Sequence, residues 1–306
     1  MPPYVLIDDI EIVFSKNKSL IEDECLLFSQ CAHSIRTNLS KYYKSTLLLS
    51  KTDVCGFIKK AKAKSDSPLI SLTTYVDADN EKIFSIESTR ALKLVGNDEG
   101  HSIFQERGIM PRHANTPKIQ TQIDYIFREL KEETRSINII DDVVFSGDTV
   151  SQYVEIFQKA GFKVEYIFCN VALSDAIKKL VKLDVEVISD CVLDDVIDII
   201  CLRDFILGAP HGGRNLILSD GSYHSVPYGY PFGEINKWAS LRGEAAHDIS
   251  RTSLEVSKLI WEKANPEITF DELGVTVHNF NPSDRIVAVI ERLLENKAYE
   301  KYNPIS

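Results

Sequence analysis

The stretch that decides the fold lies near the middle of the chain and reads Asn138-Ile139-Ile140-Asp141-Asp142-Val143-Val144-Phe145-Ser146-Gly147-Asp148-Thr149-Val150. It opens with an apolar run that predicts a buried β-strand. Two aspartates follow at once, and the small residues Ser146 and Gly147 then predict a turn that opens a helix. Strand, turn and helix in this order are the repeating unit of a mainly parallel α/β sheet.

The polar residues of this stretch indicate a site for a sugar phosphate. Ligands of open α/β sheets bind outside the carboxyl ends of the strands, where Asp141 and Asp142 are expected. The turn at 145–149 can direct backbone N–H groups and the hydroxyls of Ser146 and Thr149 at one anion beside a helix N-terminus. The two carboxylates would repel a polyphosphate but can accept hydrogen bonds from vicinal hydroxyls. The residues therefore indicate a ribose 5-phosphate held between an acid pair and a phosphate-binding turn.

The segment Ile139–Val150 resembles the substrate-binding motif of the type I phosphoribosyltransferases, with apolar residues, two acids, a variable stretch, then Thr or Ser, Gly, any residue and Thr. The resemblance identifies no subfamily. It implies that Asp141 and Asp142 contact the ribose hydroxyls of phosphoribosyl diphosphate and act as the catalytic and magnesium-binding acids. It also implies that the 5′-phosphate is bound by Phe145, Ser146, Gly147, Asp148 and Thr149. Asp148 stands at the variable position of the motif, where a side chain can point away.

Other α/β proteins also end a strand with acids and a turn. A receiver domain carries its acidic pair after the first strand, and a haloacid-type phosphatase requires Asp-x-Asp, which Asp141-Asp142-Val143 does not supply. A strand and turn with a purely structural role is the alternative interpretation.

The resemblance also assigns a pyrophosphate-binding loop. Ser50, Lys51 and Thr52 follow the predicted strand Thr46–Leu49, where the family binds pyrophosphate through backbone amides. Lys51 would meet the diphosphate as a point charge. The alternative is an ordinary exposed loop.

A second basic region is expected to be a long loop. Between residues 89 and 118 the apolar period collapses and glycine and proline recur, and a loop of this length is usually functional or disordered. It resembles in position and composition the mobile loop with which the family covers the reaction. Closure of such a lid would exclude water and bring Arg107, Arg112 and His113 to the departing pyrophosphate. The alternative is that these residues are solvated loop charges.

A glycine-rich segment after the last predicted apolar strand is the candidate acceptor site. The loop Gly208-Ala209-Pro210-His211-Gly212-Gly213-Arg214 can lay backbone groups against the edge of a planar base, and it looks somewhat like the base-recognition loop of uracil phosphoribosyltransferases. The residues assigned to this role are Arg203, Asp204, Gly208, His211 and Arg214. A glycine-rich connector, with Arg203 and Asp204 as a structural ion pair, is the alternative.

Strand and helix segments alternate through most of the chain, which predicts an α/β fold. We expect a mainly parallel sheet with helices on both faces, plus an N-terminal helix and a small C-terminal region of helices and loops. The expected division is an N-terminal helical segment at 1–44, a phosphoribosyltransferase-like core at 45–218 and a C-terminal extension at 219–306. The resemblance covers about residues 45–215.

Composition limits the partners. The 306 residues include 35 basic and 45 acidic side chains, a net charge of −10, so no global basic field favours nucleic acid. No run approaches a membrane span, and the N-terminus shows no basic and apolar leader, so a cytoplasmic protein is expected. The extensions at either end are candidates for a homodimer contact or a protein partner.

Three functions follow from this pattern. The first is a magnesium-dependent enzyme that transfers the phosphoribosyl group of phosphoribosyl diphosphate to a nitrogenous acceptor, such as a nucleobase, and releases pyrophosphate. The second is a non-catalytic sensor that keeps the phosphoribosyl pocket. The third is a nucleotide-modifying effector of a bacterial stress or phage-defence system. The acceptor cannot be identified from the residues.

Overall fold

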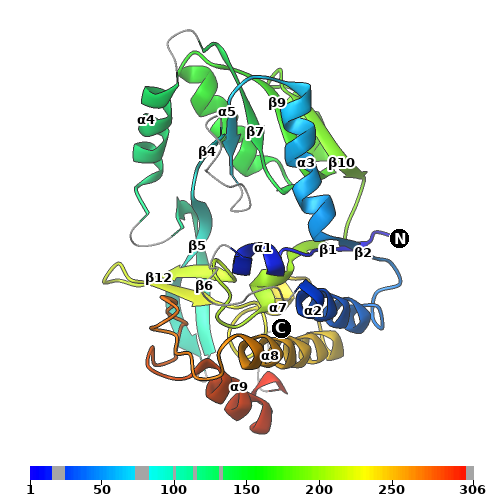
Figure 1. Ribbon diagram of the computed structural model, residues 1–306, viewed down its shortest axis with the longest axis vertical. Helices are drawn as coiled ribbons and strands as arrows, with labels where there is room; N and C mark the ends of the chain where they lie inside the picture. The colour runs from blue at the N-terminus through cyan, green and yellow to red at the C-terminus, as the bar shows by residue number, and fades with distance from the viewer. Residues whose placement is uncertain (16–24, 73–82, 99–100, 113–115, 131–133, 301–306) are drawn as a thin grey trace. The chain divides into compact units, whose positions relative to one another are not determined.

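The computed structural model describes residues 1–15, 25–72, 83–98, 101–112, 116–130 and 134–300 (Figure 1). The chain divides into two compact units. Unit 1 comprises Met1–Leu49, Thr89–Gly108 and Ile197–Ser306, and unit 2 comprises Ser50–Ser88 and Ile109–Val196. Each unit is assembled from stretches that lie far apart in the sequence, and the expected core at 45–218 contributes to both.

Unit 2 is built on a parallel sheet with the strand order β10-β9-β7-β3-β4. Its strands are β3 (Leu69–Ser71), β4 (Ile83–Ser85), β7 (Ser136–Ile140), β9 (Lys163–Leu173) and β10 (Glu186–Leu193), and the short β8 (Val143–Val144) pairs with β9. Its helices are α3 (Lys51–Lys64), α4 (Ile119–Glu129), α5 (Asp148–Lys159) and α6 (Ser174–Val181). The predicted α/β class with a mainly parallel sheet is confirmed.

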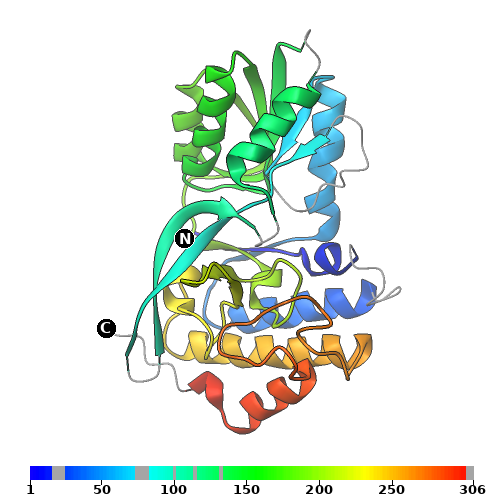
Figure 2. The same cartoon turned by 90° about the vertical axis from the view of Figure 1, so that its left-hand side faces the viewer.

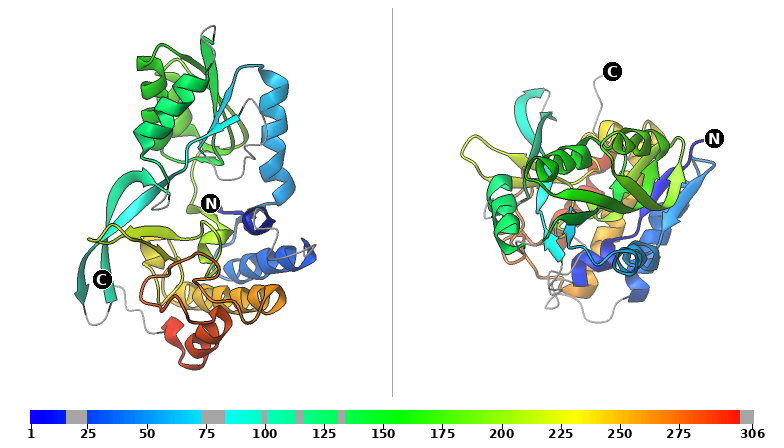
Figure 3. Two further views of the ribbon diagram at one scale, coloured as in Figure 1. Left: turned by 60° about the vertical axis from the view of Figure 1, so that its left-hand side comes forward. Right: turned by 90° about the horizontal axis from the view of Figure 1, so that it is seen from above.

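Helices cover both faces of this sheet, as Figure 3 shows. Ile140 packs with Phe57 of α3 on one face, whereas Ile139 belongs to the apolar cluster of Val154 and Phe157 of α5. Successive residues of a strand point to opposite faces, so a strand buried on both sides has a continuous apolar run instead of an alternating one. The double burial of β7 fixes the position of the two aspartates that follow it.

Unit 1 contains two further sheets, with the orders β11-β1-β2 and β13-β12-β5-β6. Their strands are β1 (Tyr4–Ile7), β2 (Thr46–Leu49), β5 (Ser88–Asp98), β6 (His101–Pro111), β11 (Asp198–Cys201), β12 (Arg214–Ile217) and β13 (Tyr223–Val226). The helices are α1 (Ile10–Ser15), α2 (Cys25–Leu39), α7 (Ile235–Trp238), α8 (Glu244–Ala264) and α9 (Ile286–Glu295), with short 3-10 helices at Leu202–Phe205 and Ala298–Glu300. In the part of the chain that the structure describes, no helix has the length and apolar character needed to cross a bilayer.

The first residues of the chain form a strand, where only a helical segment was expected. Tyr4–Ile7 are fully buried and pair in parallel with β2 and β11. A four-residue apolar run cannot be recognised by its period, which is why β1 left no signal in the sequence. Because β1 draws β2 and β11 into a sheet of their own, these two strands do not join the sheet of unit 2.

The expectation of a long loop between residues 89 and 118 is wrong for most of its length. The segment forms the neighbouring strands β5 and β6, which make the long hairpin seen in Figure 2. Only part of this hairpin is buried: Leu92 is 1% exposed, whereas Leu94 and Val95 are 42% and 52% exposed. A strand exposed along much of its length shows no buried stripe, so its apolar period is lost even though its backbone is extended.

Candidate functional site

The acid pair lies at the carboxyl end of β7, in the interior of the unit 2 sheet between β3 and β9. The backbone N–H of Asp141 donates to the carbonyl of Phe168 at 3.0 Å. The carbonyl of Asp142 accepts from the backbone N–H groups of Asn170 at 3.1 Å and Val171 at 3.3 Å. Both residues are therefore fixed to β9 through their backbone, and the Oδ1 of Asp141 accepts from the backbone N–H of Asp142 at 3.0 Å.

The two carboxyl groups lie side by side and influence each other's charge. The pKa of Asp141 is raised well above its usual value, first because protein atoms enclose its carboxyl group and second because Asp142 lies beside it. The guanidinium of Arg112 acts in the opposite direction but is a smaller effect. A ligand that supplies hydroxyl donors or positive charge would stabilise the charged form of this acid pair.

We expect Asp141→Asn to raise the melting temperature at neutral pH. A carboxyl whose pKa is raised by folding binds its proton more tightly in the folded state, so stability is lost as the pH rises above the ordinary aspartate value of about 3.9. Removal of one of two adjacent, enclosed charges should recover ~1 kcal/mol, or about 2–4 °C in Tm. Thermal unfolding from pH 3 to 8 should show curves that coincide in acid and separate above pH 4. Equal melting temperatures at pH 7 would contradict the assignment.

The predicted phosphate-binding turn joins β8 to α5. Gly147 is the N-cap of α5 and has a φ of 74°, a left-handed conformation that favours glycine. The Oγ of Ser146 accepts from the backbone N–H of Asp148 at 3.3 Å. Ser146 is exposed, Thr149 is partly buried and Phe145 is 47% exposed. Since the first N–H groups of a helix have no intrahelical acceptor, this turn presents donors for an anion.

The side chain of Asp148 is engaged by a residue outside the turn. Its carboxylate forms an ion pair with Lys179 of α6, and this hydrogen bond lowers the pKa of Asp148. The backbone of Asp148 thus belongs to the turn, whereas its side chain is directed to a neighbouring helix. Nothing in the local sequence indicated Lys179, which lies 31 residues further along the chain.

The predicted pyrophosphate loop is the start of α3 and lies near the acid pair. Asn170, 1% exposed, connects the two: its Nδ2 donates to the carbonyl of Asp53 at 2.8 Å, and its backbone N–H donates to the carbonyl of Asp142 at 3.1 Å. Ser50 is the N-cap of α3, and its N–H and Oγ donate to the carboxylate of Asp53 at 2.8 and 2.7 Å. Lys51 and Thr52 begin the helix. A polar residue within the apolar strand β9 was the signal that could have identified Asn170.

Of the three basic candidates, Arg112 is the one whose side chain the structure describes, and its charge lowers the pKa of Asp141. The Nη2 of Arg112 donates to the carbonyl of Ser88 at 2.6 Å, and its backbone N–H donates to the carbonyl of Glu87 at 3.2 Å. Glu87 is in turn held by Gln122 of α4, whose Oε1 accepts from the N–H of Glu87 at 2.8 Å. Arg107 belongs to β6 in unit 1, and its side chain lies outside the described part of the structure. His113 also lies outside the described residues.

The five residues predicted to bind the acceptor base all belong to unit 1, whereas the acid pair belongs to unit 2. Arg203 is buried and forms an ion pair with the fully buried Asp9. The carboxylate of Asp204 accepts from the backbone N–H of Gly213 at 3.0 Å. These charges therefore already serve contacts within unit 1.

Of the other three members of that set, Gly208 and Arg214 are buried and His211 is partly buried. Arg214 pairs with Glu106 and lies over the rings of Tyr228 and Trp238, at 5.8 and 5.1 Å from their centroids. Gly208, with a φ of 80°, packs against Trp261, and His211 has a φ of 57°. The aromatic residues of this region act as packing for Arg214.

The acid pair could supply only part of the coordination of a magnesium ion, and the remaining oxygens would come from water and a bound phosphate. In the described ranges, no three His, Cys, Asp or Glu side chains are grouped as a metal site. Asp141 and Asp142 supply two of the carboxylate oxygens that magnesium prefers, and this ion commonly retains water and binds substrate phosphates together with one or two carboxylates. The donor set therefore fits magnesium that arrives with a diphosphate, and not an all-protein site.

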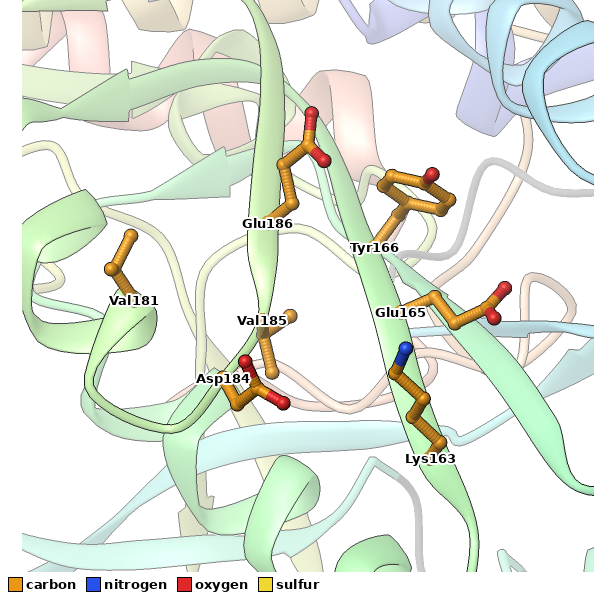
Figure 4. A pocket seen from close by; sticks show the side chains of 7 residues that line it. All are labelled: Lys163, Glu165, Tyr166, Val181, Asp184, Val185 and Glu186. Carbon is orange, nitrogen blue, oxygen red and sulfur yellow. The ribbon is translucent and has the colours of Figure 1, made fainter.

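A surface hollow of about 420 Å³ lies elsewhere in unit 2 and is lined by Lys163, Glu165, Tyr166, Val181, Asp184, Val185 and Glu186 (Figure 4). These residues come from the amino ends of β9 and β10, from the last residue of α6 and from the segment between α6 and β10. In a parallel sheet the amino and carboxyl ends of the strands lie at opposite edges. The hollow is thus at the edge remote from Asp141 and is separate from the acid pair.

Comparisons with known proteins add little to this geometry. No family model matches the chain, and no curated protein matches it. Among solved structures, an orotate phosphoribosyltransferase from Aeropyrum pernix has 14% sequence identity and a TM-score of 0.27, over 46% of this chain and 69% of that one. The protein TT1426 from Thermus thermophilus has 13% identity and a TM-score of 0.27, over 47% of this chain and 83% of that one. Sequence identities and TM-scores this low do not identify the function of this chain.

Proposed function

We propose that this chain binds phosphoribosyl diphosphate together with magnesium and transfers the phosphoribosyl group to a nitrogenous acceptor, with release of pyrophosphate. The observation that carries the proposal is the placement of two groups on one strand-turn-helix segment. Asp141 and Asp142 directly follow the end of β7, and a left-handed Gly147 opens α5 five residues later. An acid pair beside an anion-binding turn matches the two ends of a ribose 5-phosphate.

The acid pair is assigned to the ribose. Its carboxylates would accept hydrogen bonds from the 2′- and 3′-hydroxyls, while the N–H groups of the turn and the hydroxyls of Ser146 and Thr149 would hold the 5′-phosphate. Holding both ends fixes the C1 atom relative to the acceptor, and positioning of this kind supplies a large part of catalysis.

Charge develops in two places as the bond between C1 and the diphosphate breaks. The ribose ring becomes positive, which the carboxylates of Asp141 and Asp142 would stabilise, and the leaving group becomes negative. Lys51, at the start of α3, and Arg112 are the cations assigned to that negative charge. Magnesium, held by Asp141 and Asp142 together with ligand oxygens, would neutralise the diphosphate. The acceptor nitrogen attacks C1 directly, so no protein nucleophile is needed.

Two measurements test the proposal. Isothermal titration calorimetry of phosphoribosyl diphosphate with magnesium should show saturable binding, which chelation of the metal weakens. A screen of nucleobases and related acceptors, with pyrophosphate release as the readout, should then give turnover with one class of acceptor. An absence of binding at millimolar phosphoribosyl diphosphate would refute the proposal.

A sensor that binds the same ligand without transfer is the second candidate, and one observation favours it. Both donors of Ser50, the first residue of the assigned pyrophosphate loop, are engaged by Asp53 in a capping box. A loop whose donors already serve its own helix has fewer left for pyrophosphate. Saturable binding with no pyrophosphate release for any acceptor would select the sensor.

A further inference from the structure

The helix α6 lies against the phosphate-binding turn. A Cβ atom added to Gly147 would lie 3.5 Å from the Cβ of Ala176 and 3.6 Å from its carbonyl oxygen, so the backbone of the turn packs on the first turn of α6. Lys179 is three residues beyond Ala176, and residues three apart share a helix face. The packing of Gly147 on Ala176 therefore brings Lys179 to the same side as the turn.

Lys179 and Asp148 place two opposite charges beside the assigned phosphate. The Nζ of Lys179 forms an ion pair with the carboxylate of Asp148, with the two side chains 43% and 66% exposed. Asp148 is the first residue of α5, and its N–H donates to the Oγ of Ser146 at 3.3 Å. An ammonium group is thus held one residue from the glycine whose conformation forms the turn.

The charge of Asp148 is unfavourable for the ligand. A phosphate monoester is close to a dianion at neutral pH, and a carboxylate beside it repels it. The ion pair compensates for this repulsion, because the ammonium group of Lys179 attracts the phosphate as well as the carboxylate. If Lys179 were absent, the 5′-phosphate would lie beside the uncompensated negative charge of Asp148.

We propose that Lys179 is a specificity-determining residue of this site, which offsets Asp148 and allows the turn to accept a dianionic phosphate monoester. The inference rests on the proposed function, because it concerns the phosphate end of the same ligand. It assigns recognition of the phosphate to a second helix, in addition to the strand-turn-helix segment that carries the motif.

The neighbouring Lys178 provides a matched control. It lies on the same helix and pairs with Asp175 at 2.8 Å, with the two side chains 72% and 87% exposed. Its partner belongs to α6 itself and not to the turn. Substitution of Lys178 removes the same charge from the same helix without changing the pair at Asp148.

The test is calorimetric binding of ribose 5-phosphate to the full chain and to four variants. We expect Lys179→Gln to bind about tenfold more weakly, since the loss of one charge-assisted contact is typically of that size. Asp148→Asn should bind a few-fold more tightly, and the double variant should lie within about threefold of the wild type because both charges are gone. Lys178→Gln should match the wild type. The deficit of Lys179→Gln should shrink as sodium chloride is raised from 50 to 500 mM.

The outcomes separate this inference from the proposed function. If the wild type binds ribose 5-phosphate and Lys179→Gln binds equally well, the inference is wrong and the proposed function stands. An equal loss in Lys178→Gln would show a general effect of net charge and would also overturn the inference. If the wild type binds no ribose 5-phosphate, the proposed function fails first. Circular dichroism of each variant checks that the fold is retained, as expected for exposed ion pairs.

Discussion

The double substitution Asp141→Asn with Asp142→Asn is expected to lower the affinity for phosphoribosyl diphosphate by at least ~100-fold and to remove turnover. Each carboxylate is assigned a charge-assisted hydrogen bond or a magnesium contact, and such bonds contribute about 1.5–3 kcal/mol each. Two of them correspond to a factor of about 10²–10⁴ in affinity. The fold should persist, because the backbone contacts of both residues to β9 do not involve their side chains. Calorimetry with magnesium measures the loss.

The chain offers a closely matched control for this substitution. Asp194 and Asp195 are also adjacent aspartates, they follow β10, which is separated from β7 by β9, and both are exposed. The Oδ1 of Asp194 accepts from the Oγ of Ser174 at 2.6 Å, a contact that the Oδ1 of an asparagine can keep. The variant Asp194→Asn with Asp195→Asn makes the same change in net charge at the same edge of the sheet. It should bind phosphoribosyl diphosphate like the wild type. Retained affinity in the Asp141 and Asp142 variant, or an equal loss in the control, would exclude the acid pair as the ribose site.

The second large effect is expected for Gly147→Ala, which should weaken binding of ribose 5-phosphate by roughly 10- to 100-fold. A Cβ atom at this position would meet Ala176 at an ordinary contact distance of 3.5 Å, so there is room for it. The cost arises from the φ of 74°, since the left-handed conformation is unfavourable by about 1–2 kcal/mol for a residue with a Cβ. Relief of that strain would rotate the N–H groups of the turn away from the phosphate. Calorimetry and thermal unfolding measure the two effects.

Gly161, at the other end of α5, separates loss of binding from loss of stability. It has a φ of 91°, and no atom lies within 4 Å of an added Cβ. Gly161→Ala should therefore destabilise the chain by a similar ~1–2 kcal/mol through the same backbone strain. It should leave the affinity for ribose 5-phosphate unchanged. If the two variants lose affinity equally, the turn at Gly147 has no special role in binding the ligand.

Expectations based on contiguous residues were confirmed for the strand and the turn on either side of the acid pair. The apolar run before Asp141 forms β7, and the glycine after Ser146 opens α5, because a strand buried on both faces and a left-handed turn each leave a local signature. The hairpin of β5 and β6 was missed, since its exposed half has no buried face to produce a pattern. The strand β1 was missed because four apolar residues are too few to show a period.

The partners of charged side chains, unlike the strand and the turn, could not be predicted from the local sequence. The sequence predicts for Arg203 either a base-binding role or an ion pair with the adjacent Asp204, and in the structure Arg203 also pairs with Asp9, 194 residues away. Asp148 was expected to have a side chain that can point away from the turn, but its partner on α6 could not be named. Such pairs depend on which helix packs beside which strand, and no local pattern encodes that choice.

The sequence by itself determined the strand, the acid pair and the turn between residues 138 and 150, because these features depend on burial and backbone conformation within one contiguous segment. Only the tertiary structure decided which groups surround them. Asn170 joins the acid pair to α3, the charge of Arg112 lowers the pKa of Asp141, and Lys179 neutralises Asp148. Each of these residues comes from a different segment, and the distance between segments is set by the packing of the whole unit.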